Sequence, residues 1–389
     1  MTTTLFLEPL DVLFLRGNKL FGDPGSYGDA QMPPSPSVAA GAIRSRILAD
    51  DRIDLAAFER GEIRHPVLGT PQQPGEFALT AFHLARRNKN GAIEPLFAPP
   101  ADLVLTINEQ TDAPQVQALH PGVITHGIQS SYPLAQLPVL AQEKRSKPAS
   151  GYWLTLAGWQ TVLRGELPAN TQHWLHVSKL WRTDERVGIG MDAATGSVAE
   201  GRLFTTQAIA LESDIESDIG FLVAVSGAEP PQNGFLRFGG DGRAVAIRLA
   251  DVRLPEPDYA RLAAARRCRI ILTTPGIFPQ GWLPTGASPV EGGTADFVLH
   301  GVRGKIKAAA VSRFETVSGW DLANRQPKPA ERAVPTGSVY WLDELDATES
   351  DLRKLAEAGL WHTAGDNPGR RAEGFNRCTL AAWHDEGGN

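Results

Sequence analysis

The sequence is poor in cysteine, with two among 389 residues. Cys268 and Cys378 lie far apart and lack the spacing of metal ligands, so neither a disulfide framework nor a metal site is expected. No charged leader followed by an apolar run precedes Leu5, which argues against secretion and favours the cytoplasm. No apolar run approaches the roughly 20 residues that span a bilayer, so no membrane contact is expected.

An excess of positive charge is also absent. The formal net charge of −6 argues against indiscriminate coating of free nucleic acid, because such binding depends on neutralising phosphates. Any contact with nucleic acid must therefore be a local basic patch. Aromatic residues make up only 7% of the chain, whereas 39 glycines and 29 prolines predict many short strands joined by turns. The composition predicts a sheet-rich α+β protein with room for two domains.

The spacing of apolar residues switches between the period of a strand and that of a helix. It predicts a first strand over residues 4–15, a helix that starts at Ser35 and Pro36, and a hairpin turn at 239–242. Gly41 inside that helix suggests close approach of another backbone. Residues 79–85 resemble a helix. The other predicted elements are helices at 155–166, 258–267 and 349–358 and strands at 218–225, 268–273, 295–300, 305–317, 338–342 and 378–382.

A domain boundary is expected near residues 255–257, where prolines and charges separate the hairpin from the next helix. It divides the chain into an N-terminal domain, residues 1–255, and a C-terminal domain, residues 256–389. Sheets with helices on one side are expected in both halves. This pattern fits two ferredoxin-like domains with loop insertions, the fold of many RNA-recognition domains.

A basic loop precedes the predicted strand at 338–342. Pro329 and Pro335 fix φ and bias the residues before them to extended conformations, so Lys328 and Arg332 are expected on a stiff ribbon. A rigid basic loop at a sheet edge suits a phosphate backbone better than a small-molecule pocket.

Blocks spread in order over both halves carry a family resemblance. They occupy residues 5–16, 34–44, 185–190, 200–204, 239–243, 274–278, 281–284, 319–322, 327–329 and 332–338. Together they resemble the third subunit of the Cmr complex, the type III-B CRISPR RNA-guided effector, within the RAMP superfamily. The family's glycine-rich loop corresponds to residues 369–377, with Asn376 where a final glycine is common. Asparagine tolerates positive φ, so the turn is expected to form, although its side chain occupies space near a bound phosphate.

The resemblance implies a non-catalytic subunit without cofactor or metal. It would hold the 5′ tag of the CRISPR RNA and dock on the large polymerase-like subunit and an adjacent RAMP backbone subunit, in support of antiviral defence. The candidate RNA-binding residues are Arg16, Asn18, Lys19, Arg44, Arg186, Lys307, Lys328, Arg332, Arg370, Arg371, Gly374, Phe375 and Arg377.

Three local features permit RNA binding independently. Strand alternation over residues 305–313 predicts a basic stripe over an apolar one. The glycine-rich loop can present backbone N–H groups to phosphates, and the first helix carries basic side chains and has an N-terminus that is a natural anion site. The basic stripe comprises Lys305, Lys307 and Arg313, the apolar stripe Ile306, Ala308, Ala310 and Phe314, and the first helix carries Arg44 and Arg46.

Each feature has a structural alternative. Basic residues on a strand can be a solvated outer face, and both glycine-rich segments can be plain turns. Arg186 can pair with Asp184 or Glu185. The indole rings of Trp181, Trp282 and Trp320 can stack on bases, or pack in a core or a subunit interface.

A different class of function is a metal-independent endoribonuclease that processes a guide precursor, since histidine serves as general acid or base in some RAMP proteins. His65 and His83 are its candidates, but neither has a sequence neighbour that completes a catalytic group. His173 and His176 have a spacing that suits zinc on a helix, without a third ligand. The sequence contains no Walker loop, no Ser-His-Asp arrangement and no dinucleotide fingerprint. A purely protein-binding scaffold is the third alternative.

Overall fold

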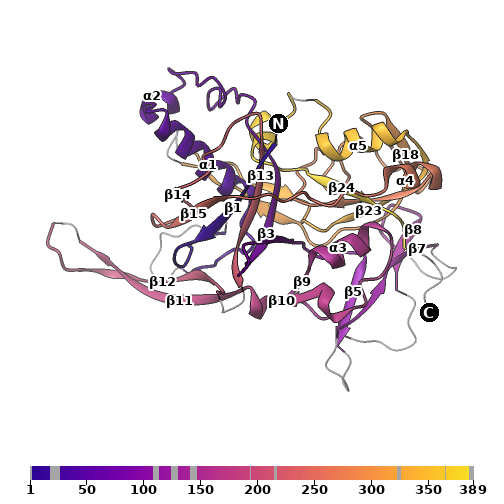
Figure 1. Ribbon diagram of the computed structural model, residues 1–389, viewed down its shortest axis with the longest axis horizontal. Coiled ribbons are helices and arrows are strands. Elements are labelled where there is room, and N and C mark those ends of the chain that lie inside the picture. Colours follow the sequence, from indigo (N-terminus) through magenta and orange to yellow (C-terminus); the bar gives the residue numbers. More distant parts are fainter. Residues whose placement is uncertain are drawn as a thin grey trace. The chain divides into compact units, whose positions relative to one another are not determined.

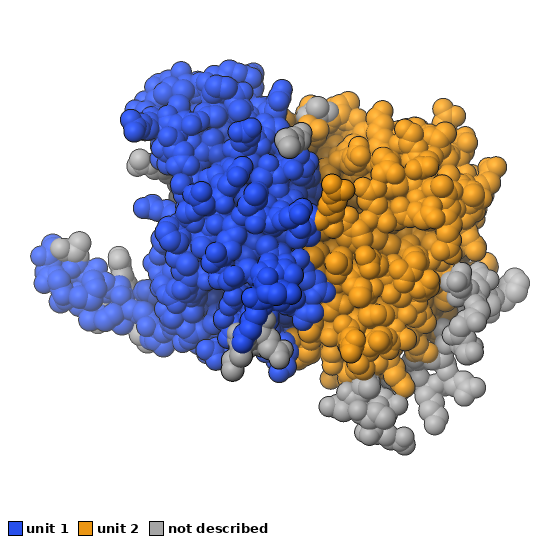
Figure 2. All heavy atoms as spheres, viewed as in Figure 1, with its two compact units in different colours: residues 1–94, 177–252, 316–330 blue, residues 95–176, 253–315, 331–389 orange. Residues whose placement is uncertain are grey.

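The computed structural model describes residues 2–17, 27–107, 114–123, 130–140, 147–192, 194–213, 217–321, 326–363 and 365–384. The chain splits into two compact units, coloured separately in Figure 2. Unit 1 contains residues 1–94, 177–252 and 316–330, and unit 2 contains residues 95–176, 253–315 and 331–389. The expected division at 255 lies near one of these boundaries. The units nevertheless differ from continuous domains 1–255 and 256–389, because residues 95–176 belong to unit 2 and residues 316–330 to unit 1.

Unit 1 is built on a six-stranded sheet with strand order β14-β15-β1-β13-β3-β4 (Figure 1). Strand β1 pairs antiparallel with both β15 and β13, and β13 pairs antiparallel with β3. The strands are β1 (Thr2–Pro9), β3 (Ala78–Asn88), β4 (Ile93–Leu96), β13 (Ser217–Ser226), β14 (Phe235–Arg237) and β15 (Ala244–Leu249). The helices between β1 and β3 are α1 (Pro36–Asp50) and α2 (Leu55–Glu59).

Several expectations for unit 1 are confirmed and two are wrong. The first strand forms but ends at Pro9, and α1 begins at Pro36 with Ser35 at its N-cap position. Gly41 is exposed, and a Cβ built there would meet no atom within 4 Å, so no backbone approaches it closely. Residues 79–85 lie in strand β3 and not in a helix. Their nearly continuous apolar run is that of a strand buried on both faces, which periodicity cannot distinguish from a buried helix.

A long two-stranded ribbon extends away from the large sheet of unit 1 (Figure 1). It consists of β11 (Trp181–Met191) and β12 (Val198–Leu211), and β2 (Tyr27–Gly28) pairs in parallel with β12. The smaller elements of unit 1 are the 3-10 helix η2 (Val177–Lys179) and the strands β20 (Trp320–Asp321) and β21 (Gln326–Pro327).

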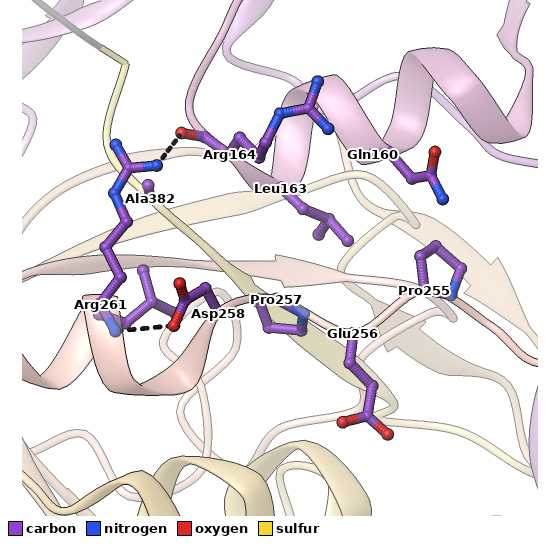
Figure 3. A pocket seen from close by; sticks show the side chains of 10 residues that line it. Gln160, Leu163, Arg164, Pro255, Glu256, Pro257, Asp258, Arg261 and Ala382 are labelled. Atoms are coloured by element: carbon purple, nitrogen blue, oxygen red, sulfur yellow. Dashed lines mark hydrogen bonds between the residues drawn. The ribbon is translucent and has the colours of Figure 1, made fainter.

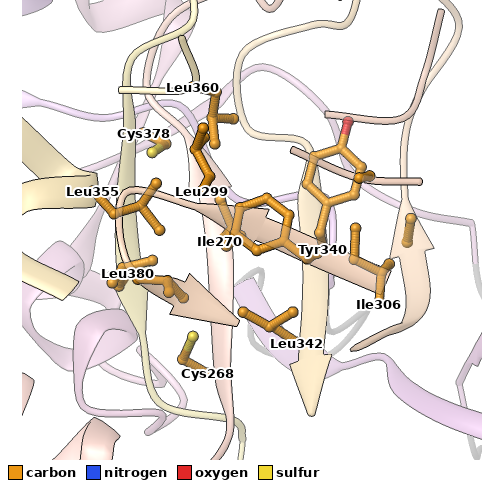
Figure 4. Close-up of a cluster of buried hydrophobic side chains, with 14 of the residues drawn as sticks. Cys268, Ile270, Leu299, Ile306, Tyr340, Leu342, Leu355, Leu360, Cys378 and Leu380 are labelled. Carbon is orange, nitrogen blue, oxygen red and sulfur yellow. The ribbon is translucent and has the colours of Figure 1, made fainter. Parts of the chain in front are cut away.

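Unit 2 is built on a five-stranded sheet with strand order β17-β18-β23-β16-β24. One face packs on α4 and α5, and Figure 4 shows this apolar cluster around Ile270 and Leu342. The other face packs on α3 through Trp159 and Trp341. Because both faces are covered, β16 and β23 carry nearly continuous apolar runs. The elements are α3 (Leu156–Leu163), α4 (Tyr259–Ala265), β16 (Cys268–Leu272), β17 (Ala295–Leu299), β18 (Val302–Ala310), β23 (Val339–Asp346), α5 (Glu349–Ala358), α6 (Pro368–Ala372) and β24 (Cys378–Ala381).

Helices α3, α4 and α5 of unit 2 begin close to where the sequence predicts, at Leu156, Tyr259 and Glu349, and side chains cap each of them. Thr155 and Asp258 accept hydrogen bonds from the first turns of α3 and α4, and Thr348 and Asp351 form a capping box at the start of α5.

The remaining strands of the chain are β5 (Leu103–Ile107), β6 (Pro114–Ala118), β7 (His120–Val123), β8 (Gln136–Val139), β9 (Tyr152–Leu154), β10 (Trp174–His176), β19 (Glu315–Val317) and β22 (Glu331–Ala333), with a 3-10 helix η1 (Thr171–His173).

The predicted alternation along β18 is wrong. The strand has register shifts relative to β23, one of them between Ile306 and Ala308. Ile306 therefore packs in the cluster shown in Figure 4, whereas Ala308 and Ala310 pack on the opposite face of the sheet. The strand ends at Ala310, so Phe314 lies beyond it and is 50% exposed.

Among the described residues, no helix combines the length and the apolar character that crossing a membrane requires.

Candidate nucleic-acid interface

Three sequence blocks that lie far apart along the chain meet in unit 2. They are residues 274–278, 331–338 and 368–377, called here the loop cluster. Gly276 and Val334 exchange backbone hydrogen bonds of 2.8 and 2.7 Å, and the backbone N–H of Asn376 donates to the Pro275 carbonyl at 3.0 Å. The proline-rich basic loop and the glycine-rich loop are therefore held together by the backbone.

Asn376 fixes the turn of the glycine-rich loop. Its φ of 59° is positive, as expected for a position where the family commonly has glycine. The side chain is fully buried: its carbonyl oxygen accepts from Ile277 N at 2.7 Å, and its amide nitrogen donates to Ile277 O at 3.1 Å and Leu360 O at 3.2 Å. The expected turn is confirmed, and the side chain is buried inside the protein.

Arg370 joins the two loops of the cluster through an ion pair. Its guanidinium lies 2.7 Å from Glu331 and 2.9 Å from Glu373, and it stands over the Phe375 ring at 5.2 Å. The side chain is 6% exposed, so the two carboxylates compensate its charge inside the protein. Arg370 and the fully buried Phe375 support the loop and do not present a surface to a ligand.

Arg377 stabilises the end of helix α5. Its guanidinium donates to the carbonyls of Glu357 at 2.7 Å and Ala358 at 3.4 Å, and its backbone N–H donates to Thr274 Oγ at 3.0 Å. Burial lowers the pKa of Arg377. A basic side chain on the last carbonyls of a helix is a common C-terminal arrangement. Gly374, with φ of 89°, provides the preceding turn.

Two arginines of the loop cluster remain uncompensated. Arg332, on β22, is exposed, and its guanidinium lies 4.8 Å above the ring of Phe314. Arg371, on α6, is partly exposed. Within the described part of the chain, neither side chain has an ion-pair partner. These two guanidinium groups are the ones that the cluster can offer to an anion.

Lys307 lies outside the loop cluster and is already paired. Lys305 and Lys307 each place Nζ 2.8 Å from the carboxylate of Glu344. Hydrogen bonds from Lys305 and then Lys307 hold the pKa of Glu344 at about 2. In the strand register, Lys305 also lies opposite Asp296 and Asp343. The expected basic stripe is therefore a face of mixed charge.

In unit 1, three blocks meet at Phe14. Arg186 and Arg243 stand over its ring at 5.9 and 5.2 Å, and Gly240 N donates to Phe14 O at 2.8 Å. Arg186 pairs with Asp184 at 2.9 Å, which is the ion pair considered above as the alternative to RNA binding. Arg243 pairs with Asp11, so both arginines have acidic partners.

The other candidates of unit 1 are not assembled into one site by any described contact. Arg16 is exposed next to a bridge between its backbone and Ala30, Arg44 is partly exposed on α1, and the Lys328 N–H donates to Gly319 O at 2.9 Å. Asn18 and Lys19 lie outside the described residues, as does the side chain of Trp320.

Two of the three candidate tryptophans, Trp181 and Trp282, have side chains that the structure describes. Trp181 is partly exposed on β11. Trp282 packs against the core of unit 2 and stacks on Tyr132 with ring centroids 6.0 Å apart, which agrees with the packing alternative.

The two candidate catalytic histidines occupy buried positions. His65 is 3% exposed, and its Nε2 lies 2.8 Å from Asp51 while Nδ1 accepts from the backbone N–H groups of Val67 and Leu68. His83 is buried on β3, and this burial lowers its pKa to about 4. Among the described residues, no group of three His, Cys, Asp or Glu side chains could hold a metal.

An exposed apolar face on the β11–β12 ribbon was not predicted. Val187, Ile189 and Met191 are 71%, 49% and 52% exposed, and Val198, which pairs with Met191, is 57% exposed. Their alternation in the sequence is the signal that could have revealed this face. On the other face Phe204 lies across Gly188, where a Cβ would come within 2.4 Å of the ring.

A surface pocket with a volume of about 480 Å³ lies in unit 2, and Figure 3 shows the residues that line it. Arg261 Nη1 donates to the Arg164 carbonyl at 3.4 Å, and the Arg261 backbone N–H donates to Asp258 at 2.9 Å. Arg164 pairs with Glu166 at 2.9 Å. The pocket carries charges of both signs, and none of the candidate RNA-binding residues lines it. The lining residues are Gln160, Leu163, Arg164, Pro255, Glu256, Pro257, Asp258, Arg261, Leu262 and Ala382.

Comparison with known proteins gives one match to a family model. The model, described as CRISPR-associated protein (Cas_Cmr3), matches residues 5–383. This match confirms the resemblance that the sequence blocks indicated. No curated protein matches the chain.

Two solved structures show a weak likeness. One is a chain of the cryo-EM structure of the type III-B Cmr-beta bound to cognate target RNA, at 12% identity and a TM-score of 0.45, covering 97% of this chain and 96% of that chain. The other is a chain of the same assembly bound to cognate target RNA and AMPPnP, state 1, at 12% identity and a TM-score of 0.43, covering 95% and 92%.

Proposed function

Since the chain belongs to the Cas_Cmr3 family of CRISPR-associated proteins, we propose that it is a non-catalytic subunit of a type III-B CRISPR effector. In this role it holds the 5′ tag of the CRISPR RNA in the cytoplasm and docks on the large polymerase-like subunit and a neighbouring RAMP subunit. The observation that carries the proposal is the Arg370–Glu331 ion pair of 2.7 Å, because it joins two loops that each bear one uncompensated arginine.

The charges of the loop cluster support phosphate binding. The cluster's two acidic side chains, Glu331 and Glu373, both pair with Arg370, and the cluster also contains Arg332, Arg371 and Arg377, so its four arginines exceed its two carboxylates. Arg332 and Arg371 therefore keep a local positive charge on a molecule whose formal net charge is −6. A small positive site favours one segment of RNA over indiscriminate coating.

The strand order of both sheets supports two ferredoxin-like domains. Such a domain has four strands in a β-α-β-β-α-β sequence, with the first strand between the third and the fourth and the second strand beside the third. The unit 1 strands β1, β3, β13 and β15 follow this order, and so do β16, β18, β23 and β24 of unit 2. Helix α1 occupies the first helical connection in unit 1, and α5 the second in unit 2.

The apolar face of the ribbon supports assembly with a partner subunit. Val187 is 71% exposed and Val198 is 57% exposed, and exposed apolar patches mark interaction surfaces. In this role the ribbon contacts another subunit of the effector, which buries the apolar face.

The test is RNA binding by the assembled complex over a range of salt concentrations. Arg332→Gln and Arg371→Gln should each weaken binding of tag-bearing RNA and lower the slope of log K against log salt by about one phosphate. Lys307→Gln is the matched control, because its charge is already paired with Glu344, and it should change the slope less. Equal affinities and slopes for both arginine variants and the parent complex would contradict the assignment.

The endoribonuclease alternative has its own assay. The purified chain is incubated with precursor RNA without metal, and we expect no cleavage, because both ring nitrogens of His65 are already hydrogen-bonded. Cleavage that disappears in His65→Ala or His83→Ala would favour the nuclease instead. A protein-binding scaffold would give no RNA crosslinks to this chain in the assembled particle.

A further inference from the structure

Phe314 is an exposed aromatic side chain next to the loop cluster. It lies four residues beyond the end of β18, and half of its surface is exposed. The Arg332 guanidinium stands over the ring, with 4.8 Å between Cζ and the ring centroid. A residue expected on the apolar stripe of a strand is therefore at the surface beyond that strand, paired with one of the two uncompensated arginines.

A phenyl ring paired with a guanidinium has the shape and charge that suit an unpaired nucleotide. Bases of single-stranded RNA stack on aromatic rings and on guanidinium planes, and the sugar-phosphate backbone needs a positive charge close by. Phe314 and Arg332 place both kinds of group within contact distance of each other.

The surroundings of the pair keep it positively charged. Glu331, the chain neighbour of Arg332, is engaged by Arg370 at 2.7 Å. Burial raises the pKa of Glu315, the chain neighbour of Phe314, to about 7, so this carboxyl carries only part of a negative charge at neutral pH. Arg313 is exposed and, among the described residues, has no ion-pair partner.

The same surroundings disfavour an apolar protein partner. Ser312 and Arg313, which precede the ring, are exposed and polar, and the charged Arg332 guanidinium stands over the ring. Protein contacts of high affinity instead bury an aromatic anchor inside a larger desolvated patch.

We infer that Phe314 and Arg332 form a stacking site for one unpaired nucleotide of an RNA strand, whose base lies on the pair while its phosphate contacts a neighbouring arginine. The inference rests on the proposed function, because it names the part of the RNA that the loop cluster holds. It adds Phe314 to the binding residues and gives Arg332 a second role beyond charge.

The experiment uses the assembled complex with a series of guide RNAs, each carrying the fluorescent base 2-aminopurine at one successive unpaired position. Stacking quenches this base, so one position should be quenched more than its neighbours. Phe314→Leu should remove that quenching and lower RNA affinity by about 5- to 150-fold, the range for loss of one base stack. The slope of log K against log salt should stay unchanged, because no charge is lost.

Two further variants separate stacking from charge and from folding. Phe314→Tyr keeps the ring and should retain both quenching and affinity. Arg332→Lys keeps the charge but loses the planar group, so it should preserve the salt slope and weaken the quenching. The thermal midpoint of each purified variant should match that of the parent, since Phe314 is already half exposed.

Each contrary result has a distinct meaning. Normal RNA binding with quenching and affinity unchanged in Phe314→Leu overturns the stacking site and leaves the proposed function intact. Loss of partner subunits from the Phe314→Leu complex, with RNA affinity unchanged, makes Phe314 a protein contact and also overturns the inference. A parent complex that binds no guide RNA overturns the proposed function together with the stacking site.

Discussion

Replacing Asn376 by glycine separates two physical effects at one position of the glycine-rich loop. Glycine relieves the strain of a positive φ of 59°, but it removes a buried amide that makes three hydrogen bonds. If the conformation alone mattered, Asn376→Gly would stabilise the protein. If the hydrogen bonds matter more, it destabilises.

The hydrogen bonds are expected to dominate. Each buried bond contributes about 1 kcal/mol, and a buried group left without a partner costs about 1–3 kcal/mol. The change leaves Ile277 N, Ile277 O and Leu360 O without the Asn376 amide, so we expect a loss of about 2–4 kcal/mol. Asn376→Ala should lose about 1 kcal/mol more, because alanine is strained in the left-handed region.

The assay is urea denaturation of the purified chain, and Arg266→Gly is the matched control. Arg266 has a φ of 53° at the end of α4, but its side chain is exposed. Glycine there relieves strain without removing a buried bond, so it should be neutral or stabilise by up to about 1 kcal/mol. Equal stability of Asn376→Gly and the parent would refute the reasoning, since the buried amide would then contribute nothing.

Three other substitutions have outcomes that the structure determines. Burial lowers the pKa of His83 from 6.5 in the unfolded chain to about 4 in the folded protein. The free energy of unfolding should therefore be highest above pH 6.5 and fall by about 3 kcal/mol as the pH drops to 4. His83→Leu should remove this part of the pH dependence, measured by denaturation at a series of pH values. Arg370→Met should cost about 3–5 kcal/mol, because it leaves the buried Glu373 unpaired, and a loss below 1 kcal/mol in the same assay would contradict that account. Gly188→Ala should displace the Phe204 ring and speed proteolysis within the ribbon, whereas an unchanged cleavage rate would show that the ring moves without cost.

Local sequence signals gave the elements, and the errors lie where local signals are ambiguous. The proline after Ser35 predicted the start of α1, and Thr348 with Asp351 forms the cap that begins α5. The run around His83 was predicted to be helical, because a strand covered on both faces has no period of two. The register shift after Ile306 could not be predicted, because a bulge depends on the partner strand.

The candidate site was likewise predicted only in part. The sequence identified both loops of the cluster as candidate RNA-binding segments, and in the structure their side chains Arg332 and Arg371 remain available to an anion. Arg370 was also named, but its compensation by Glu331 and Glu373 involves a residue 39 positions away, which no local pattern indicates. The exposure of Phe314 likewise depends on where β18 ends.

The sequence by itself determined the family, most helices and strands, and the loops that carry basic residues, because these depend on local composition and on blocks of adjacent residues. Only the tertiary structure decided which charges are compensated and which face of a strand is buried. Ion pairs and packing join residues from distant segments, and their energies depend on separation in space rather than along the chain.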